Sequence, residues 1–165
     1  MAVKASKHVF SQTDKSIGLF LKTMNTNPAN PEWQVFLKEC KADKRIYVLI
    51  ETMDRPDVLG LIDCCDAYMS LHKAEGFDRT IAEAILLSKL VIASDYSGNV
   101  DFQDTINYLS VEVKSVKVTS LDYQWVDFED EAVWGDDVLE SCINKMTRIR
   151  NKSDTHVCDV DLIKF

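Results

Sequence analysis

Mostly apolar runs of strand length alternate with helix-like segments, and this alternation limits the fold more than any other feature of the chain. The apolar runs occupy residues 17–22, 46–50, 67–71 and 90–94. Strands buried on both faces of a parallel sheet have this continuous apolar character, whereas strands with one wet face alternate. The intervening segments have helical spacing and the connections are short. The order predicts an α/β fold, a doubly wound parallel sheet with helices on its faces.

Helix start signals support this order. A loop rich in proline and asparagine at residues 25–31 precedes helical spacing over 32–41, and Asp54 can cap a helix whose first turn holds Pro56. A further helix is expected at 79–88, a helical turn at 100–104 and a strand at 108–113. For the first fifteen residues the sequence predicts only a short helix end and a turn.

The C-terminal third has weaker signals. Residues 116–118 are expected to form a short edge strand. The carboxylate-rich run 127–137 lacks the spacing of an EF-hand and is expected to be a solvated acidic loop. A helix is predicted at 138–149 with Asp136 or Asp137 as its N-cap, followed by an extended strap or frayed end at 151–165.

Length and charge narrow the class of protein. A chain of 165 residues is long enough for one domain, predicted to span 1–165 with a core at 16–150. The net charge of −8, from 27 acidic and 19 basic residues, disfavours nucleic acid as a partner, because phosphate backbones are bound mainly by lysine and arginine. No apolar run approaches the roughly 20 residues of a membrane span, and the N-terminus lacks a signal-peptide core. The sequence therefore predicts a cytoplasmic protein without a transmembrane segment.

The cysteines give no sign of a metal site. Five cysteines are present, without a C-x-x-C pair and without histidines at the spacing of zinc ligands. An odd number without such spacing predicts reduced, mostly buried thiols, with no structural metal ion or disulfide. No cofactor is expected either. These cysteines are Cys40, Cys64, Cys65, Cys142 and Cys158.

The stretch 69–102 is the candidate ligand site. A strand leads through a loop containing Glu75 and Gly76 into an apolar helix that carries Glu83, with seven residues between the two glutamates. A glycine turn that opens a helix after a strand favours a phosphate-bearing ligand, because the helix start exposes unpaired N–H groups and a positive dipole end. On residue type alone, glutamates like Glu75 and Glu83 are most often ordinary surface carboxylates, one of them at a helix start where the dipole favours it.

The same stretch resembles the donor-binding half of retaining glycosyltransferases of family 4, whose GT-B fold has two doubly wound α/β domains. The resemblance rests on E-G-F-x-x-x-x-A-E-A at 75–84, the strand LVIAS at 90–94 and Tyr96-Ser97-Gly98-Asn99 ahead of Asp101-Phe102. The phrase CDAYMSLHKAEGF at 65–77 also resembles the strand that delivers this loop. The similarity covers residues 16–148.

This resemblance implies a role for each matched position. Glu75 would be the catalytic residue, holding the hydroxyls of the donor sugar and stabilising its reacting face, and Glu83 would accept hydrogen bonds from the ribose hydroxyls. Backbone N–H groups of residues 76–81 would cradle the diphosphate. Thr52 and Met53 would lie near the base, and residues 95–99 would close the sugar side. The implied donor site thus contains Gly76, Phe77, Asp78, Arg79, Thr80, Gly98 and Asn99 in addition.

The implied reaction is transfer of a glycosyl group with retention, with a nucleoside diphosphate as leaving group. Positive groups must stabilise the charge on that diphosphate. His72, Lys73 and Lys22 are the candidates, although a lone histidine at a strand end is more often a packed or solvent-facing residue.

Three departures from the family pattern shape the functional hypotheses. Asp78 replaces a second glycine where the diphosphate should lie, and would repel the donor unless Arg79 or Lys73 neutralises it. Ser88 and Leu90 replace a glycine and a proline after the helix. The acceptor-binding half is missing, together with the first strand of the donor domain and its Arg/Lys pair.

The chain could therefore be a truncated enzyme, a split enzyme with a partner chain, or a degenerate relative. The first hypothesis is a glycosyltransferase donor domain that acts with a separate acceptor domain. The alternatives are a non-catalytic nucleotide-sugar-binding or interaction module, and a sugar-nucleotide epimerase of the same fold. A missing first strand would leave a sheet edge that another copy or chain could cover.

Overall fold

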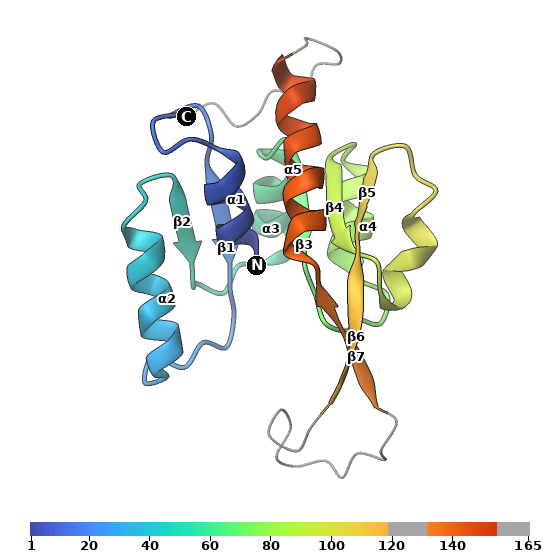
Figure 1. Cartoon of the computed structure of the whole chain (residues 1–165), viewed down its shortest axis with the longest axis horizontal. Helices are drawn as coiled ribbons and strands as arrows, with labels where there is room; N and C mark the ends of the chain where they lie inside the picture. Colours follow the sequence, from blue (N-terminus) through green and yellow to red (C-terminus); the bar gives the residue numbers. More distant parts are fainter. Residues whose placement is uncertain (119–131, 155–165) are drawn as a thin grey trace.

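The computed structural model describes residues 1–118 and 132–154 and has a mixed α/β fold (Figure 1). Its helices and strands alternate through β5, as the sequence predicts. The elements are α1 (Ala2–Val9), β1 (Leu19–Lys22), α2 (Pro31–Lys41), β2 (Ile46–Leu49), α3 (Arg55–Asp63), β3 (Ala67–Ser70), α4 (Arg79–Leu86), β4 (Leu90–Ser94), a 3-10 helix η1 (Ser97–Phe102), β5 (Tyr108–Val111), β6 (Val113–Lys117), β7 (Val133–Asp137) and α5 (Leu139–Asp154).

The strands form small sheets. β1 and β2 pair in parallel, β3, β4 and β5 form a second parallel sheet in that order, and β6 and β7 form an antiparallel pair. The parallel pairing agrees with the sequence, but β1 and β3 do not pair in the described residues, so the strands form separate small sheets. The arrangement is compatible with a Rossmann-like α/β fold.

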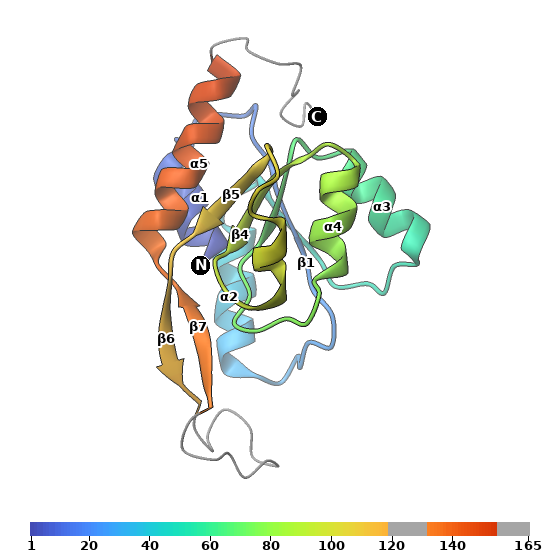
Figure 2. The same cartoon turned by 90° about the vertical axis from the view of Figure 1, so that its right-hand side faces the viewer.

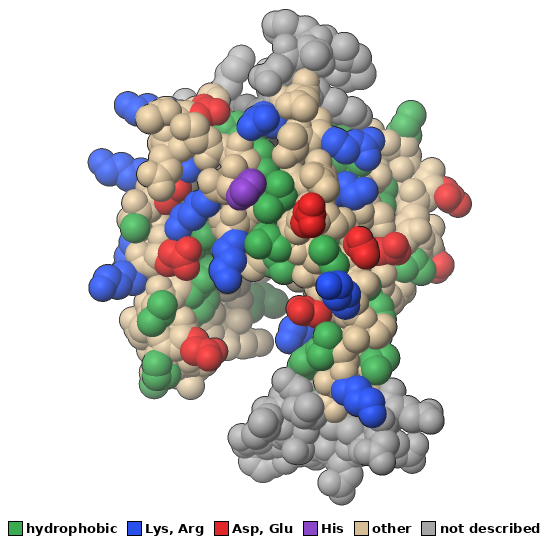
Figure 3. All heavy atoms as spheres, in the orientation of Figure 1, with side chains coloured by type: hydrophobic (Ala, Val, Ile, Leu, Met, Phe, Trp, Pro, Cys, Tyr) green, Lys and Arg blue, Asp and Glu red, His purple; other side chains and the backbone are tan. Residues whose placement is uncertain are grey.

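Helices cover both faces of the three-stranded sheet. On β4, Leu90 and Ile92 pack with residues of α1 and α5, such as Met146, while Val91 and Ala93 pack against α3 and α4. Figure 2 shows these layers, with α5 and α1 on one side of β4 and α4 and α3 on the other. Figure 3 shows apolar side chains gathered along the line between α1 and α5. Burial on both faces accounts for the continuous apolar sequence of β4.

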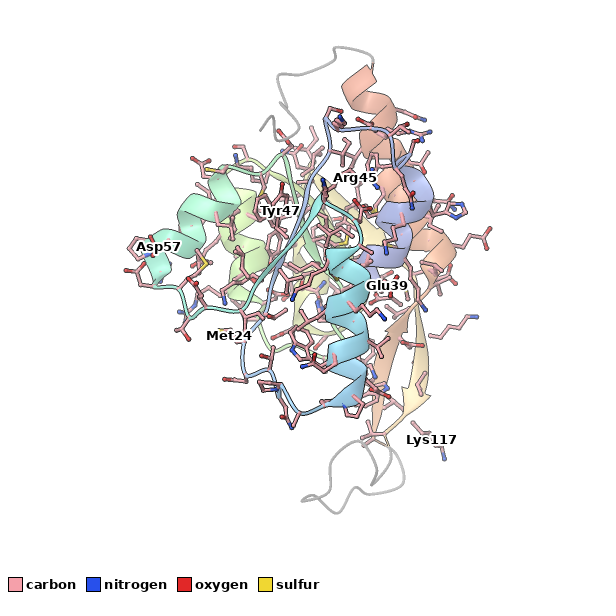
Figure 4. The ribbon with its side chains drawn as sticks, turned by 90° about the vertical axis from the view of Figure 1, so that its left-hand side faces the viewer. Met24, Glu39, Arg45, Tyr47, Asp57 and Lys117 are labelled. Atoms are coloured by element: carbon pink, nitrogen blue, oxygen red, sulfur yellow. The ribbon has the colours of Figure 1, made fainter. Side chains whose placement is uncertain are left out.

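The N-terminal helix α1 contributes to the core before residue 16, where the sequence predicts only a helix end and a turn. Its Val3 packs with Cys40 of α2 and Ile46 of β2, and its Ala5 and Val9 pack with α5. Figure 4 shows the side of the molecule formed by β1, α2 and β2, where Tyr47 of β2 and Met24 after β1 are exposed.

Several local predictions are confirmed. Asp54 caps α3 by accepting a hydrogen bond from the Asp57 N–H at 3.0 Å, and Pro56 lies in its first turn. β4 has the predicted bounds, and the edge strand expected at 116–118 corresponds to the end of β6.

Three predictions for the C-terminal third are corrected. Residues 133–137 form strand β7, and α5 continues to Asp154, five residues beyond its predicted end. α5 begins at Leu139, so Val138 precedes it in the N-cap position, whereas Asp136 and Asp137 belong to β7 and Asp137 Oδ1 accepts a hydrogen bond from Ser94 Oγ at 2.7 Å. The rest of the predicted acidic loop, at 127–131, and most of the predicted strap, at 155–165, lie outside the described residues.

Two further points concern cysteines and membranes. Cys40 and Cys142 are buried, but Cys64 is exposed and Cys65 half-buried, so the expectation of mostly buried thiols holds for only two of these four; Cys158 lies outside the described residues. No helix in residues 1–118 and 132–154 is long and apolar enough to cross a membrane.

Candidate functional site

The predicted site residues lie where β3 and β4 end. The loop after β3 carries His72, Glu75 and Gly76 to the start of α4, and the loop after β4 carries Ser97 and Gly98. Because parallel strands end at the same edge, these loops meet there, and this edge is where open α/β sheets bind ligands.

The two loops are in direct contact at Glu75. Ser97 Oγ donates a short hydrogen bond to the Glu75 carbonyl oxygen, and the Glu75 N–H lies 3.3 Å from Ser97 Oγ. At Gly98, a Cβ atom would lie 1.5 Å from the carbonyl oxygen of Gly76, so only glycine permits this approach. The predicted sugar side and the predicted glycine turn therefore form one surface.

Gly76 itself has no steric reason to be glycine. A Cβ atom there would meet nothing within 4 Å, and none of the described glycines has a positive φ. Since glycine costs backbone entropy on folding, a ligand that approaches the main chain closely is one physical reason for its presence.

Asp78 is the N-cap of α4. Its Oδ1 accepts hydrogen bonds from the Ile81 N–H at 3.2 Å and from Thr80 Oγ1 at 2.9 Å, and its Oδ2 accepts from Ser70 Oγ at 2.9 Å. Asp78 has φ of 50° and is 8% exposed. The resemblance predicts that the Ile81 N–H faces a diphosphate, but this N–H already donates its hydrogen bond to the Asp78 carboxylate.

The side chain that faces Asp78 is His72. His72 Nδ1 lies 3.5 Å from Asp78 Oδ2 and 3.1 Å from Ser70 Oγ, so a histidine lies where Arg79 or Lys73 was expected. The His72 side chain is only 8% exposed. His72 is therefore part of a buried network with Asp78 and Ser70, and its contact with a leaving group stays a prediction.

Asn99 fixes the other side of the His72 ring. Its amide nitrogen donates to the Ser94 carbonyl oxygen at 2.7 Å and to the Tyr108 hydroxyl at 2.6 Å, which leaves its oxygen 2.9 Å from His72 Nε2. Since the amide oxygen of Asn99 can only accept, Nε2 must donate to it. His72 and Asn99, both predicted for the donor site, contact each other and so join the two loops.

Glu83 is a buried carboxylate, which excludes the alternative of an ordinary surface residue. Glu83 is 8% exposed and faces inward from α4. Glu83 Oε1 lies 2.8 Å from Nη2 of Arg55, at the start of α3. No N–H of Arg55 points at this oxygen well enough to count as a hydrogen bond, so the contact is an ion pair only. The Arg55 side chain is 64% exposed and covers this oxygen. Glu83 thus keeps an unused acceptor that a hydroxyl group could fill.

Tyr68 of β3 lies near three carboxylates of this site. The Tyr68 hydroxyl donates to Thr80 Oγ1 at 2.7 Å. Burial raises the pKa of Tyr68, the Thr80 hydrogen bond opposes this, and the nearby charges of Asp78, Glu75 and Glu83 raise the pKa further. Glu75 itself, like Gly76, Phe77 and Arg79, is exposed.

The remaining predicted residues lie at or just after the ends of β1, β2 and β3. Lys73 Nζ lies 3.9 Å from the ring centroid of Trp134 in β7, and Lys22 Nζ donates to the Thr23 carbonyl oxygen at 3.0 Å. Thr52 is exposed and Met53 half-buried, just before Arg55. The loop after β2 therefore reaches α4 through Arg55, a residue that the sequence analysis missed because no motif marks it.

The β6–β7 hairpin closes the site at one side. The Gly135 N–H donates to the Lys73 carbonyl oxygen at 2.9 Å, and the Tyr96 hydroxyl donates to the Val133 carbonyl oxygen at 3.0 Å. Burial raises the pKa of Asp137, while the Ser94 hydrogen bond and the charge of His72 oppose the rise. No group of histidine, cysteine, aspartate and glutamate suited to a metal ion occurs within the described parts of the chain.

Comparison of the chain with protein-family models, curated proteins and solved structures found no match. The functional argument therefore depends on the residues of this site.

Proposed function

We propose that the chain binds a nucleotide sugar at the ends of β3 and β4 and is the donor-binding half of a retaining glycosyltransferase, catalytic only with an acceptor domain. In this proposal the chain is one doubly wound GT-B half-domain. The proposal rests on the resemblance of residues 75–84 to the family motif together with the site geometry.

Glu83 is the observation that carries the proposal. Glu83 is 8% exposed, and its Oε1 accepts no directed hydrogen bond although it lies 2.8 Å from the exposed Arg55 side chain, so this carboxylate has acceptor capacity left for the donor groups of a ligand. Ribose hydroxyls are such donors, and an ionised carboxylate accepts two of them side by side. Ribose binding requires the exposed Arg55 side chain to move from Oε1, which would free its guanidinium for the phosphates.

The exposed Glu75 and the open space at Gly76 complete the proposed pocket. Glu75 would contact the sugar, and the diphosphate would pass over the Gly76 backbone, where no Cβ obstructs it. The exposed cations Lys73 and Arg79 lie on either side of this loop in sequence and could balance the phosphate charge.

A non-catalytic nucleotide-sugar-binding module is the second candidate, and Asp78 favours it. Its carboxylate occupies the Ile81 N–H that a phosphate would use, and a buried negative charge there weakens binding of an anionic leaving group. Glycosyl transfer in the presence of an acceptor domain would support the glycosyltransferase. Binding of a nucleotide sugar without any transfer or donor hydrolysis would support the non-catalytic module.

Calorimetric titration with UDP-, GDP- and ADP-sugars tests the shared claim. Binding of one donor class is expected, and Gly76→Ala should weaken it about tenfold or more while leaving the urea unfolding midpoint unchanged or higher. Gly60→Ala in α3 is the matched control, because its Cβ also meets nothing within 4 Å. Equal donor affinity of the Gly76→Ala and Gly60→Ala variants would contradict the claim that the diphosphate passes over the Gly76 backbone.

A further inference from the structure

The ion pair between Arg55 and Glu83 joins an exposed side chain to a buried one. Arg55 is the first residue of α3 and its side chain is 64% exposed, whereas the Glu83 side chain, on α4, is 9% exposed. In residues 1–118 and 132–154 the Arg55 guanidinium makes no other salt bridge and donates no hydrogen bond. It can therefore leave Glu83 without breaking another polar contact there.

The position of Arg55 is unfavourable for α3 itself. The start of a helix carries the positive end of the helix dipole, so acidic residues are favoured there and cations are disfavoured. Asp54 and Asp57 follow this rule, as the N-cap and as an acidic residue of the first turn. Asp57 lies at the outer end of α3 (Figure 4). Helix stability thus gives no reason for an arginine at this position, and its contact with Glu83 lies in the proposed site.

Arg55 and a ribose compete for the same oxygen atom. In the proposed site a ribose diol bridges both oxygens of the Glu83 carboxylate, including the Oε1 atom that lies 2.8 Å from Arg55 Nη2. Every ligand that contains a ribose must therefore displace the guanidinium. Its apparent affinity is lowered by the fraction of molecules in which the ion pair is closed.

Only a ligand that bears phosphate recovers this loss. The displaced guanidinium stays tethered to the start of α3, close to the bound ribose. In a nucleotide, one carbon and one oxygen atom separate the ribose ring from the first phosphorus, so the phosphate lies near the displaced side chain. Arginine binds phosphate through paired N–H groups, and such charge-assisted hydrogen bonds are stronger than neutral ones. A free nucleoside offers the guanidinium no such partner.

The contacts around the site increase the value of this cation. The Ile81 N–H donates to the Asp78 carboxylate, so the start of α4 does not offer that N–H to a phosphate. Lys73 Nζ lies 3.9 Å from the ring centroid of Trp134 and so already has a partner in β7. The positive charge of Arg55, brought from the neighbouring helix, would supplement these groups beside a diphosphate.

We propose that Arg55 is a specificity-determining residue of this site: its ion pair with Glu83 disfavours free nucleosides, and its transfer to the phosphates favours nucleoside diphosphates and their sugars. The inference rests on the proposed function, because it takes Glu83 as the ribose acceptor. It adds a selection among ligands that share the same ribose. Since Arg55 opposes binding of one class and supports binding of the other, its removal should change the two affinities in opposite directions.

Calorimetric titration of the full chain and of Arg55→Ala with uridine, guanosine and adenosine, and with UDP, GDP and ADP, tests this selection. For the base that binds, nucleoside affinity should rise about two- to fivefold in the variant, the worth of an exposed ion pair. Affinity for the matching diphosphate should fall about tenfold or more, because charged hydrogen bonds are lost. Arg148→Ala is the matched control, since Arg148 is exposed on α5, across β4 from α3 (Figure 2), and both affinities should be unchanged.

The outcomes separate this inference from the proposed function. No binding of any nucleoside or diphosphate by the unmodified chain would contradict the proposed function and the inference with it. If a diphosphate binds, an unchanged diphosphate affinity in Arg55→Ala would overturn the role of Arg55 alone. A nucleoside that binds no better to this variant than to the unmodified chain would also overturn it.

The salt dependence of nucleoside binding gives a second test, on the unmodified chain. Uridine, guanosine and adenosine carry no net charge, but salt weakens an exposed ion pair that competes with them. Their affinity should therefore rise with ionic strength in the unmodified chain and not in Arg55→Ala. A salt dependence that is the same in both proteins would contradict the competition between Arg55 and the ribose.

Discussion

Asp78→Gly should lower stability and raise donor affinity at the same time. Loss of the α4 cap costs about 1 kcal/mol. The hydroxyls of Ser70 and Thr80 each lose an acceptor, which costs about 1 kcal/mol per group. Glycine at φ of 50° recovers about 1 kcal/mol of backbone strain. The net expectation is a loss of about 1–3 kcal/mol, or a Tm lower by about 2–12 °C.

Urea unfolding followed by circular dichroism measures this loss, and Ser88→Gly isolates the backbone contribution. Ser88 is exposed and also has a positive φ, of 59°, so glycine there should stabilise the fold by about 0.5–1 kcal/mol. The Asp78→Gly variant should bind a nucleotide sugar more tightly, because the Ile81 N–H is freed and a negative charge is removed. A variant as stable as the unmodified chain would refute the capping argument, and unchanged affinity in a chain that binds donor would refute the claim that Asp78 impairs the site.

Two further predictions concern a close contact and an ion pair. Gly98→Ala should destabilise the fold by about 1–3 kcal/mol, because its Cβ would lie 1.5 Å from the Gly76 carbonyl oxygen, and an unchanged urea midpoint would contradict the contact between the loops. Asp43→Asn should cost about 1–2 kcal/mol at pH 7, since hydrogen bonds from Arg45 (Figure 4) lower the pKa of Asp43 from 3.8 to about 2. A lowered pKa stabilises the fold above pH 3.8 and this contribution is lost as pH falls through 2, so the two unfolding free energies should converge below that pH; a constant difference would argue against the ion pair.

The local elements could be predicted because their signals lie within a few residues of sequence. Asp54 and Pro56 predict the start of α3, and the continuous apolar run of β4 predicts that both faces of this strand are buried. By contrast, the sequence does not predict β7 at 133–137, because its carboxylates suggest a solvated loop. This strand depends on pairing with β6 rather than on an apolar face.

The site shows the same division. The sequence places Glu75, Gly76 and Gly98 in loops that meet, since parallel strands end at one edge. It could not show that Asp78 caps α4 or that His72 faces Asp78, because both depend on the path of the loop between β3 and α4. The pairing of Arg55 with Glu83 depends on how α3 packs against α4, which no local pattern encodes.

The central claim is that the Glu83 carboxylate binds the ribose hydroxyls of a nucleotide sugar. Calorimetric titration of the full chain and of Glu83→Gln with UDP-, GDP- and ADP-sugars at millimolar concentration tests it most directly. Glu83→Gln keeps the shape of the side chain but loses its charge, so affinity for the bound donor should fall by about 1–3 kcal/mol, or roughly 5- to 150-fold. No heat with any donor, or equal affinity of the two proteins, would contradict the account.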